Sequence, residues 1–294
     1  MTAASSTVGQ YPGSAGDALV GPKWLTAHLD DPGMRVIEVD VSPAAYDAGH
    51  IDGAILWNVY RDLKDADYRT IGRQAVEELL GRSGIDRQST VVFYGYAPAL
   101  GFWLLKLYGH RDVRILDSGR QASMDAGLPW TTGAPARKQT RYQLPDELAP
   151  IRADQPTVQS VMGRAGSIIL DVRTDLEFRG ERFWPSGGQE PGGRAGHIPS
   201  AVNLCTDGIL DDQGRFRSRS ELRAIFEPVD GARSDVIIYC TIGGRASTAW
   251  FALTYLLGRN DVRVYDGSWA EWGRLPTTPV ASTITTSEAG EDVS

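Results

Sequence analysis

Short apolar runs rich in β-branched residues recur along the chain, and none of them alternates apolar with polar positions. That pattern is typical of strands covered on both faces of a parallel sheet. The clearest runs are 36–39, 91–94, 168–172 and 236–239. Helical stretches separate them, the clearest being 73–82, 220–226 and 246–257. Strand–helix alternation of this kind predicts an α/β protein.

The same order of segments occurs twice. Each half has a buried run, a Gly-His-Ile turn, a second run, a helix that ends in Leu-Tyr-Gly or Leu-Leu-Gly, and a run that ends in aspartate. The later matching segments are 49–54 with 196–201, 107–109 with 256–258, and 113–117 with 262–266. Agreement in order and spacing indicates an internal duplication. We therefore expect two duplicated domains, at 19–130 and 153–280, each a mainly parallel sheet with helices on both faces.

The remaining segments lack such a pattern. Residues 1–18 and 281–294 are small and polar, so we expect both to be disordered. Residues 131–152 are polar and carry three prolines, which predicts an interdomain linker. Residues 180–193 are rich in Gly and Pro and have no counterpart in the first half. This insertion must be a loop, which either covers the entrance of a cleft or is a solvated excursion.

Composition narrows the class of protein. A length of 294 residues suits two domains, and a net charge of −7 argues against a general nucleic-acid binder. A local pocket can still hold a small anion. Two cysteines, Cys205 and Cys240, cannot build a disulfide framework, which favours a reducing compartment. We see neither a signal peptide nor an apolar stretch near the ~20 residues of a membrane span, so we expect a cytoplasmic protein without membrane contact. The oligomeric state stays open.

One segment of the second half carries the chemistry. A buried run ends at a cysteine, two glycines follow, and a helix opens near Ala246. The loop consists of Cys240, Thr241, Ile242, Gly243, Gly244 and Arg245. Open α/β sheets place their sites at the carboxyl ends of strands, and glycines let backbone N–H groups form an anion-binding nest. The helix N-terminus and Arg245 add positive charge, so we expect a reactive thiolate at Cys240 that works on a small anion.

At these residues the sequence resembles the tandem-domain form of the rhodanese family of sulfurtransferases, above all its bacterial thiosulfate sulfurtransferases. The matching segments are 46–54, 196–201, 240–245 and 262–272. The resemblance implies that the Cys240 thiolate takes the outer sulfur of thiosulfate and releases sulfite. Backbone N–H groups of 241–245 would hold the persulfide until a thiophilic acceptor, cyanide or a thiol, removes the sulfur. No metal or organic cofactor is implied, because the enzyme itself carries the group.

Three alternatives remain open. 3-Mercaptopyruvate could be the donor, although such enzymes usually have a smaller loop than Thr241 and Ile242 provide. A phosphatase relative would need one more residue between Cys240 and Arg245. A non-catalytic binding module would not need that pair at all. The family often has an arginine that helps to hold the substrate anion where this chain has Glu177. The candidates to replace that arginine are Arg173, Arg179, Arg182 and Arg194.

The other chemistry-bearing residues have structural interpretations. Gly95 is the counterpart of Cys240, and Pro98 removes an N–H there, so the first domain should be catalytically silent and should wall the cleft. We interpret the equivalent residues His50 and His197 as structural, and Glu38 and Asp171 as acceptors that anchor loops. Cys205 is predicted to be a buried residue on or next to a strand. Trp269 is assigned to substrate binding, with core packing as the alternative for it and for Trp272.

Overall fold

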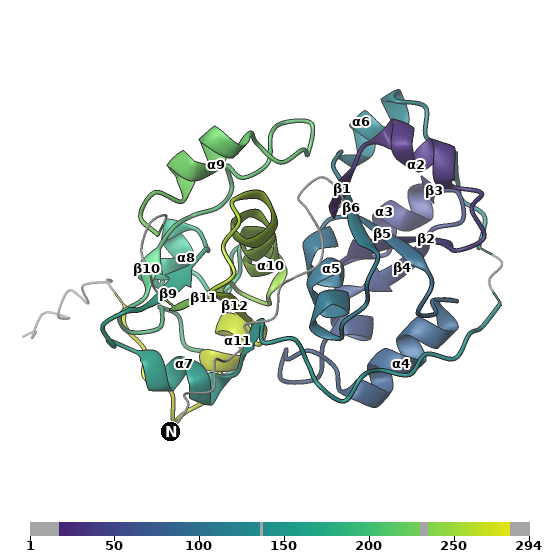
Figure 1. Ribbon diagram of the computed structural model, residues 1–294. Helices are drawn as coiled ribbons and strands as arrows, with labels where there is room; N and C mark the ends of the chain where they lie inside the picture. The colour runs from purple at the N-terminus through teal and green to yellow at the C-terminus, as the bar shows by residue number, and fades with distance from the viewer. Residues whose placement is uncertain (1–17, 136–137, 230–234, 283–294) are drawn as a thin grey trace, which may run out of the picture.

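The computed structural model describes residues 18–135, 138–229 and 235–282, and two five-stranded sheets organise them (Figure 1). The first sheet has the order β1-β6-β5-β2-β4, and the second, read from its far edge, β8-β12-β11-β9-β10. The first comprises β1 (Leu19–Val20), β2 (Met34–Asp40), β4 (Ile55–Asn58), β5 (Thr90–Gly95) and β6 (Val113–Leu116). The second comprises β8 (Arg152–Ala153), β9 (Ser167–Asp171), β10 (Val202–Asn203), β11 (Asp235–Tyr239) and β12 (Val262–Tyr265). Neighbouring strands are parallel and the chain visits both sheets in the same order, which confirms the duplicated α/β fold.

Helices flank both sheets. Those of the first half are α2 (Pro22–His28), α3 (Ala44–Ala48), α4 (Arg73–Arg82), α5 (Pro98–Leu107) and α6 (Arg120–Asp125), with a π-helical turn η1 (Val59–Leu63). Those of the second half are α7 (Gln155–Val161), α8 (Asp175–Arg179), α9 (Arg219–Ile225), α10 (Gly244–Phe251), a π-helical turn η2 (Ala252–Leu256) and α11 (Ser268–Trp272). The expected helix 73–82 is α4, and 220–226 is α9 shifted by one residue. The expected helix 246–257 corresponds to α10 and η2 together.

Strand β11 supplies two different hydrophobic cores, because successive side chains of a strand point to opposite faces of the sheet. Ile237 and Tyr239 pack into the outer core of the second domain. Val236, Ile238 and Cys240 belong to a larger core that also contains residues of the first domain. Period-two alternation therefore directs Cys240 toward the face that meets the first domain.

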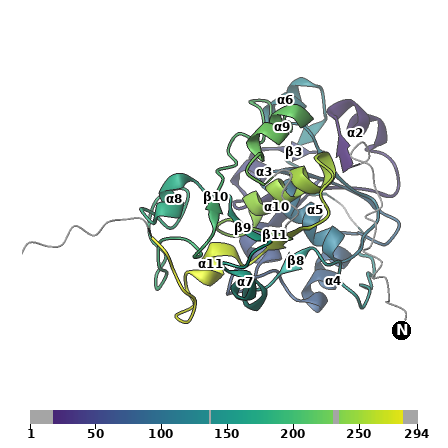
Figure 2. The same ribbon diagram turned by 60° about the vertical axis from the view of Figure 1, so that its left-hand side comes forward.

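The two domains share that larger core through α5 and α10, which lie side by side in both ribbon views (Figures 1 and 2). Phe102 of α5 packs edge-on against Phe251 and Tyr255, with ring centroids 4.9 and 5.0 Å apart. Because these apolar faces exclude water from a continuous region, the two domains pack against each other and are not independent units joined only by a linker.

The connecting and terminal segments are more ordered than their composition suggests. In the expected linker, Tyr142 and Leu144 are buried against the first domain. A short antiparallel pair joins β3 (His50–Ile51) to β7 (Trp130–Thr131). Of the segments expected to be disordered, Ala18 is buried and Ala281 pairs with His197, whereas 1–17 and 283–294 lie outside the described residues.

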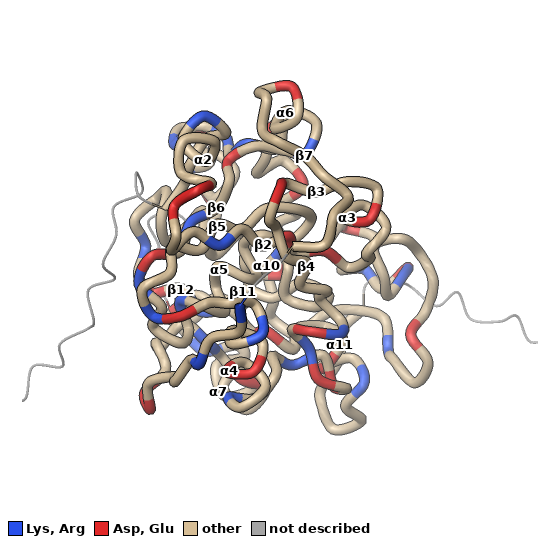
Figure 3. Tube along the Cα trace, turned by 90° about the vertical axis from the view of Figure 1, so that its right-hand side faces the viewer, with Lys and Arg blue, Asp and Glu red and all other residues tan. Residues whose placement is uncertain are grey.

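Acidic and basic residues are interspersed along the trace of both domains (Figure 3). Several pair with a neighbour in sequence, as Arg69 does with Asp65 and Arg215 with Asp211. Across 18–135, 138–229 and 235–282, no helix combines the length and the apolarity needed to cross a membrane.

Candidate active site

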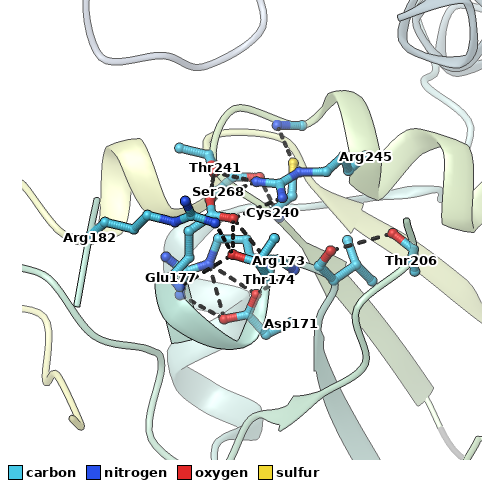
Figure 4. Close-up of polar contacts among 12 residues, drawn as sticks. Asp171, Arg173, Thr174, Glu177, Arg182, Thr206, Cys240, Thr241, Arg245 and Ser268 are labelled. Atoms are coloured by element: carbon cyan, nitrogen blue, oxygen red, sulfur yellow. Dashed lines mark hydrogen bonds and ion pairs between the residues drawn. The ribbon is translucent and has the colours of Figure 1, made fainter. Parts of the chain in front are cut away.

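The cysteine loop is fixed by the first turn of α11. The Cys240 N–H donates to Ser268 Oγ at 3.2 Å, and the Cys240 carbonyl accepts the Trp269 N–H at 2.9 Å. The Ala270 N–H donates to the Thr241 carbonyl at 2.9 Å. These three bonds hold the loop backbone in place, so the buried thiol has a defined position (Figure 4).

Gly243 determines the shape of the loop. Its N–H donates to Cys240 Sγ at 3.1 Å, and its φ of +95° is in the left-handed region that favours glycine. A Cβ there would lie 3.1 Å from the Asp266 carbonyl oxygen and 3.2 Å from Lys64 Nζ. The residue also caps α10, whose N-terminus adds partial positive charge next to the sulfur. Any larger residue would disturb the bond to Sγ.

Arg245 is held by a carboxylate. Its guanidinium makes two bonds to Glu177, of 2.9 and 2.7 Å, and a third of 2.8 Å to Thr241 Oγ1. The Thr241 hydroxyl in turn donates to Glu177 at 2.8 Å (Figure 4). Burial alone would raise the pKa of Glu177, but hydrogen bonds from Arg245 and its charge outweigh burial and lower that pKa to about 2. Glu177 is therefore a carboxylate bound to Arg245, and it also completes the capping box of α8 with Thr174.

None of the four arginines proposed to replace a family arginine lines the cavity beside Cys240, so that expectation is wrong. Each has another partner instead. The partners are Asp171 for Arg173, Asp175 for Arg179, Thr174 for Arg182, and backbone carbonyls near Thr278 for Arg194.

A cavity of about 450 Å³ opens in front of the loop. The second domain contributes Cys240, Thr241, Ile242, Gly244 and Arg245 to its lining, and the first contributes Tyr60, Tyr96, Ala97 and Leu100. Trp184, Pro185 and Ser186 of the insertion close a third side. The first domain therefore walls the cleft as expected, and the insertion belongs to the wall rather than being a solvated excursion.

Trp269 and Trp272 do not line this cavity, which corrects the assignment of Trp269 to substrate binding. Both are fully buried in the outer core of the second domain. The Trp269 ring stacks on the Arg173 guanidinium at 4.7 Å. Because α11 runs beneath the loop, its backbone contacts the loop while its indoles point into the core.

Lys64 is the site residue that the sequence analysis missed. It follows η1 in the first domain, is buried, and donates to the Asp266 carbonyl at 2.7 Å. Burial lowers the pKa of Lys64, against the opposing charges of Asp266 and Cys240. No local pattern marks this lysine, because only the docking of the two domains brings it to the loop.

The remaining candidates have structural contacts. His50 and His197 each donate from Nδ1 to a backbone carbonyl, that of Tyr46 at 2.9 Å and that of Phe178 at 2.8 Å. Each imidazole also stacks on the ring of the same residue. Glu38 pairs with Arg120, and Asp171 with Arg173. These contacts agree with the structural interpretation. Cys205 follows β10 but is exposed, so the prediction that it is buried is wrong.

Within 18–135, 138–229 and 235–282, no group of three or more His, Cys, Asp or Glu residues is placed to hold a metal ion. The chemistry available at the loop is therefore that of one buried thiol, a backbone donor and two nearby cations.

Duplicated parallel α/β domains with one cysteine loop at their interface define a tandem-domain cysteine enzyme. The family model for the rhodanese-like domain matches this chain twice, at residues 21–125 and 154–275. The chain belongs to the rhodanese family.

Relatives and solved structures agree with this assignment. The sulfur carrier protein TtuD of Thermus thermophilus is 40% identical over 275 residues, covering 90% of this chain and 96% of that protein. A thiosulfate sulfurtransferase of Corynebacterium glutamicum is 36% identical over 274 residues, 90% of each. These names support an enzyme of the sulfurtransferase class. The wild-type structure of EanB has a TM-score of 0.79 at 21% identity over 92% of this chain and 70% of that one, which establishes the fold alone.

Proposed function

We propose that this enzyme moves sulfane sulfur from thiosulfate to a thiophilic acceptor, cyanide or a thiol, through a persulfide on Cys240. One observation carries the proposal: Cys240 Sγ lies at a cavity and accepts the Gly243 N–H at 3.1 Å. A backbone donor aimed at sulfur stabilises the thiolate before the reaction and an anionic persulfide after it.

The reaction has two displacements. The thiolate attacks the outer sulfur of thiosulfate, a new S–S bond forms, and the old S–S bond breaks as sulfite leaves with the electron pair. The acceptor then attacks the outer sulfur of the persulfide and regenerates the Cys240 thiolate. No net oxidation is required, and no residue other than Cys240 forms a covalent bond.

The cavity supports an organic acceptor larger than cyanide. Its volume of about 450 Å³ lies within the range of roughly 300–1,000 Å³ found for sites of small organic molecules. Tyr60, Tyr96 and Trp184 supply apolar surface around its opening, which suits the body of an organic thiol. The name of the Thermus relative, a sulfur carrier protein, agrees with a persulfide that is passed on.

One observation favours 3-mercaptopyruvate as the alternative donor. Glu177 binds the Arg245 guanidinium through two hydrogen bonds, so less positive charge is left for a dianion such as thiosulfate. A monoanionic donor such as 3-mercaptopyruvate needs less positive charge in the site than a dianion does. Steady-state kinetics with each donor and cyanide compare the two proposals directly. A higher kcat/KM for thiosulfate supports the first, and a higher value for 3-mercaptopyruvate replaces it by the second.

The persulfide has its own test. Incubation with thiosulfate should add one sulfur, about 32 mass units for a single nucleophilic thiol, and cyanide should remove it. Intact-protein mass spectrometry followed by peptide mapping measures this. An adduct on Cys205, or none at all with either donor, would contradict a Cys240 persulfide.

A further inference from the structure

The catalytic loop is backed by a charged side chain of the other domain. Lys64 is 5% exposed, and its Nζ would lie 3.2 Å from a Cβ added to Gly243. The Gly243 N–H is the group that donates to Cys240 Sγ. The ammonium therefore lies next to the residue that contacts the sulfur, and Lys64 itself does not line the cavity.

Three cations, Lys64, Arg152 and Arg245, lie near the loop, and two of them are paired with a carboxylate. Glu271 is a further buried acid near Arg152 and Asp266. Arg245 binds Glu177 at 2.7 Å, and Arg152 binds Asp266 at 2.7 Å. The hydrogen bond of Lys64 goes instead to the neutral carbonyl of Asp266.

A buried ammonium is costly unless an anion compensates it. Asp266 supplies part of that compensation and already shares its carboxylate with Arg152. Asp65, the other acid near Lys64, is bound to Arg69 at 3.2 Å. A Cys240 thiolate is the second anion, after Asp266, that acts on Lys64.

We propose that the Lys64 ammonium, supplied by the silent first domain, is the counter-ion that keeps Cys240 as a thiolate and its persulfide as an anion. Lys64 is thus a positioning residue, because it acts through the loop and not on the substrate. The proposal deepens the proposed function and rests on Cys240 being its nucleophile.

Domain docking sets this arrangement. Lys64 and Thr70 form an isolated β-bridge, and the Thr70 N–H donates to Asp266 Oδ2 at 2.6 Å. Lys64 and Thr70, at the two ends of the segment 64–70, therefore both bind Asp266, the first residue of the turn from β12 to α11. If the domains separated, the cation would leave with the first domain.

The test measures the rate of Cys240 alkylation by iodoacetamide against pH, in a Cys205→Ser background so that one thiol reacts. Lys64→Met should move the midpoint upward by about 1 unit or more, because a charge within about 4–6 Å favours the ionised thiol. Lys64→Arg keeps the positive charge, so its midpoint should lie close to that of the wild type. Lys106→Met is the matched control, since Lys106 is a partly buried lysine of α5 bound to carbonyls near Arg111. It should leave the midpoint unchanged.

Stability separates a charge effect from a structural one. Met matches the length of Lys without its charge, so Lys64→Met should keep the packing of the side chain and still fold, with some loss of stability from the missing hydrogen bond to the Asp266 carbonyl. An unshifted midpoint overturns the proposal, and so does a Lys64→Met protein that no longer folds, because the lysine would then be a structural tie. Alkylation needs no sulfur donor. If the midpoint shifts but the wild-type enzyme is inactive with both donors, the proposal for Lys64 holds and the proposed function is contradicted instead.

Discussion

The two domains place equivalent loops beside one cavity, and only one of the loops carries a cysteine. Strand β5 ends at Gly95 and β11 ends just before Cys240. At Gly95 the φ is +104°, and a Cβ would come within 2.9 Å of the Val39 carbonyl oxygen. A cysteine there would require the backbone to move. Pro98 then opens α5 and offers no N–H, whereas Gly243 offers one to sulfur.

The comparison shows what the first domain contributes. It has no cysteine, but Tyr96, Ala97 and Leu100 beside its own loop form a wall of the cavity. It also supplies Lys64. The duplication has thus produced one loop with a thiol and one that helps to wall the cavity in front of it.

The largest expected effect comes from replacing Cys240, the thiol that one loop has and the other lacks. Cys240→Ser should abolish sulfur transfer, because an alcohol cannot form the persulfide. Cys205→Ser should retain most of the activity, since Cys205 is exposed and does not line the cavity. Steady-state assays of both variants measure this. If Cys205→Ser were inactive and Cys240→Ser active, the reactive cysteine would be Cys205 and not Cys240.

The next effect concerns the Arg245–Glu177 pair, which the silent domain lacks. Arg245→Ala should destabilise the protein by about 3–5 kcal/mol, because it leaves a buried carboxylate without its cation. Adding Glu177→Gln to that variant should recover part of the loss. Urea unfolding of the single and double variants measures the coupling. Additive losses would show that the two side chains do not support each other.

Acid should weaken the same pair. The pKa of Glu177 is lowered from 4.5 to about 2, so its carboxylate stabilises the fold above pH ~4.5 and loses that contribution as the pH falls toward ~2. The contribution is on the order of 2–3 kcal/mol. Unfolding of wild type and Glu177→Gln from about pH 7 down to about pH 3 should show a difference that shrinks with acid. A constant difference would contradict the assignment.

Gly243→Ala tests the loop geometry against a matched glycine. Gly258 has a φ of +84° with nothing within 4 Å of an added Cβ, so both substitutions carry the same backbone strain of about 1–2 kcal/mol. Only Gly243→Ala should also disturb the bond to sulfur, and we expect roughly a 10-fold lower kcat/KM from a lost hydrogen bond of about 1.4 kcal/mol. Equal kinetics of the two variants would mean that this bond is not used.

The smallest effect is expected at the cavity mouth. Tyr96 is 66% exposed, so Tyr96→Ala should leave stability within about 0.5 kcal/mol. Loss of its apolar surface should raise the KM for an organic thiol about 3-fold, equivalent to some 0.6 kcal/mol, and leave the KM for cyanide unchanged. Parallel assays with the two acceptors measure this, and equal changes would show that Tyr96 does not select the acceptor.

The sequence by itself determined the duplicated α/β fold and the identity of the cysteine loop. Continuous apolar runs and helical patterns are local, so helix 73–82 emerges with its observed bounds. A strand followed by a loop that contains a cysteine, two glycines and an arginine is also a local signal. The lack of a thiol at Gly95 is another.

Only the tertiary structure decided which partners those residues meet. Glu177 and Arg245 are 68 residues apart, and Lys64 and Asp266 are 202 apart. Trp269 points into the core because α11 lies beneath the loop, and Cys205 is exposed although a free cysteine is usually buried. Contacts of this kind depend on how helices and domains pack, which no pattern within one segment encodes. The charge that meets a thiol is therefore a property of the docked domains.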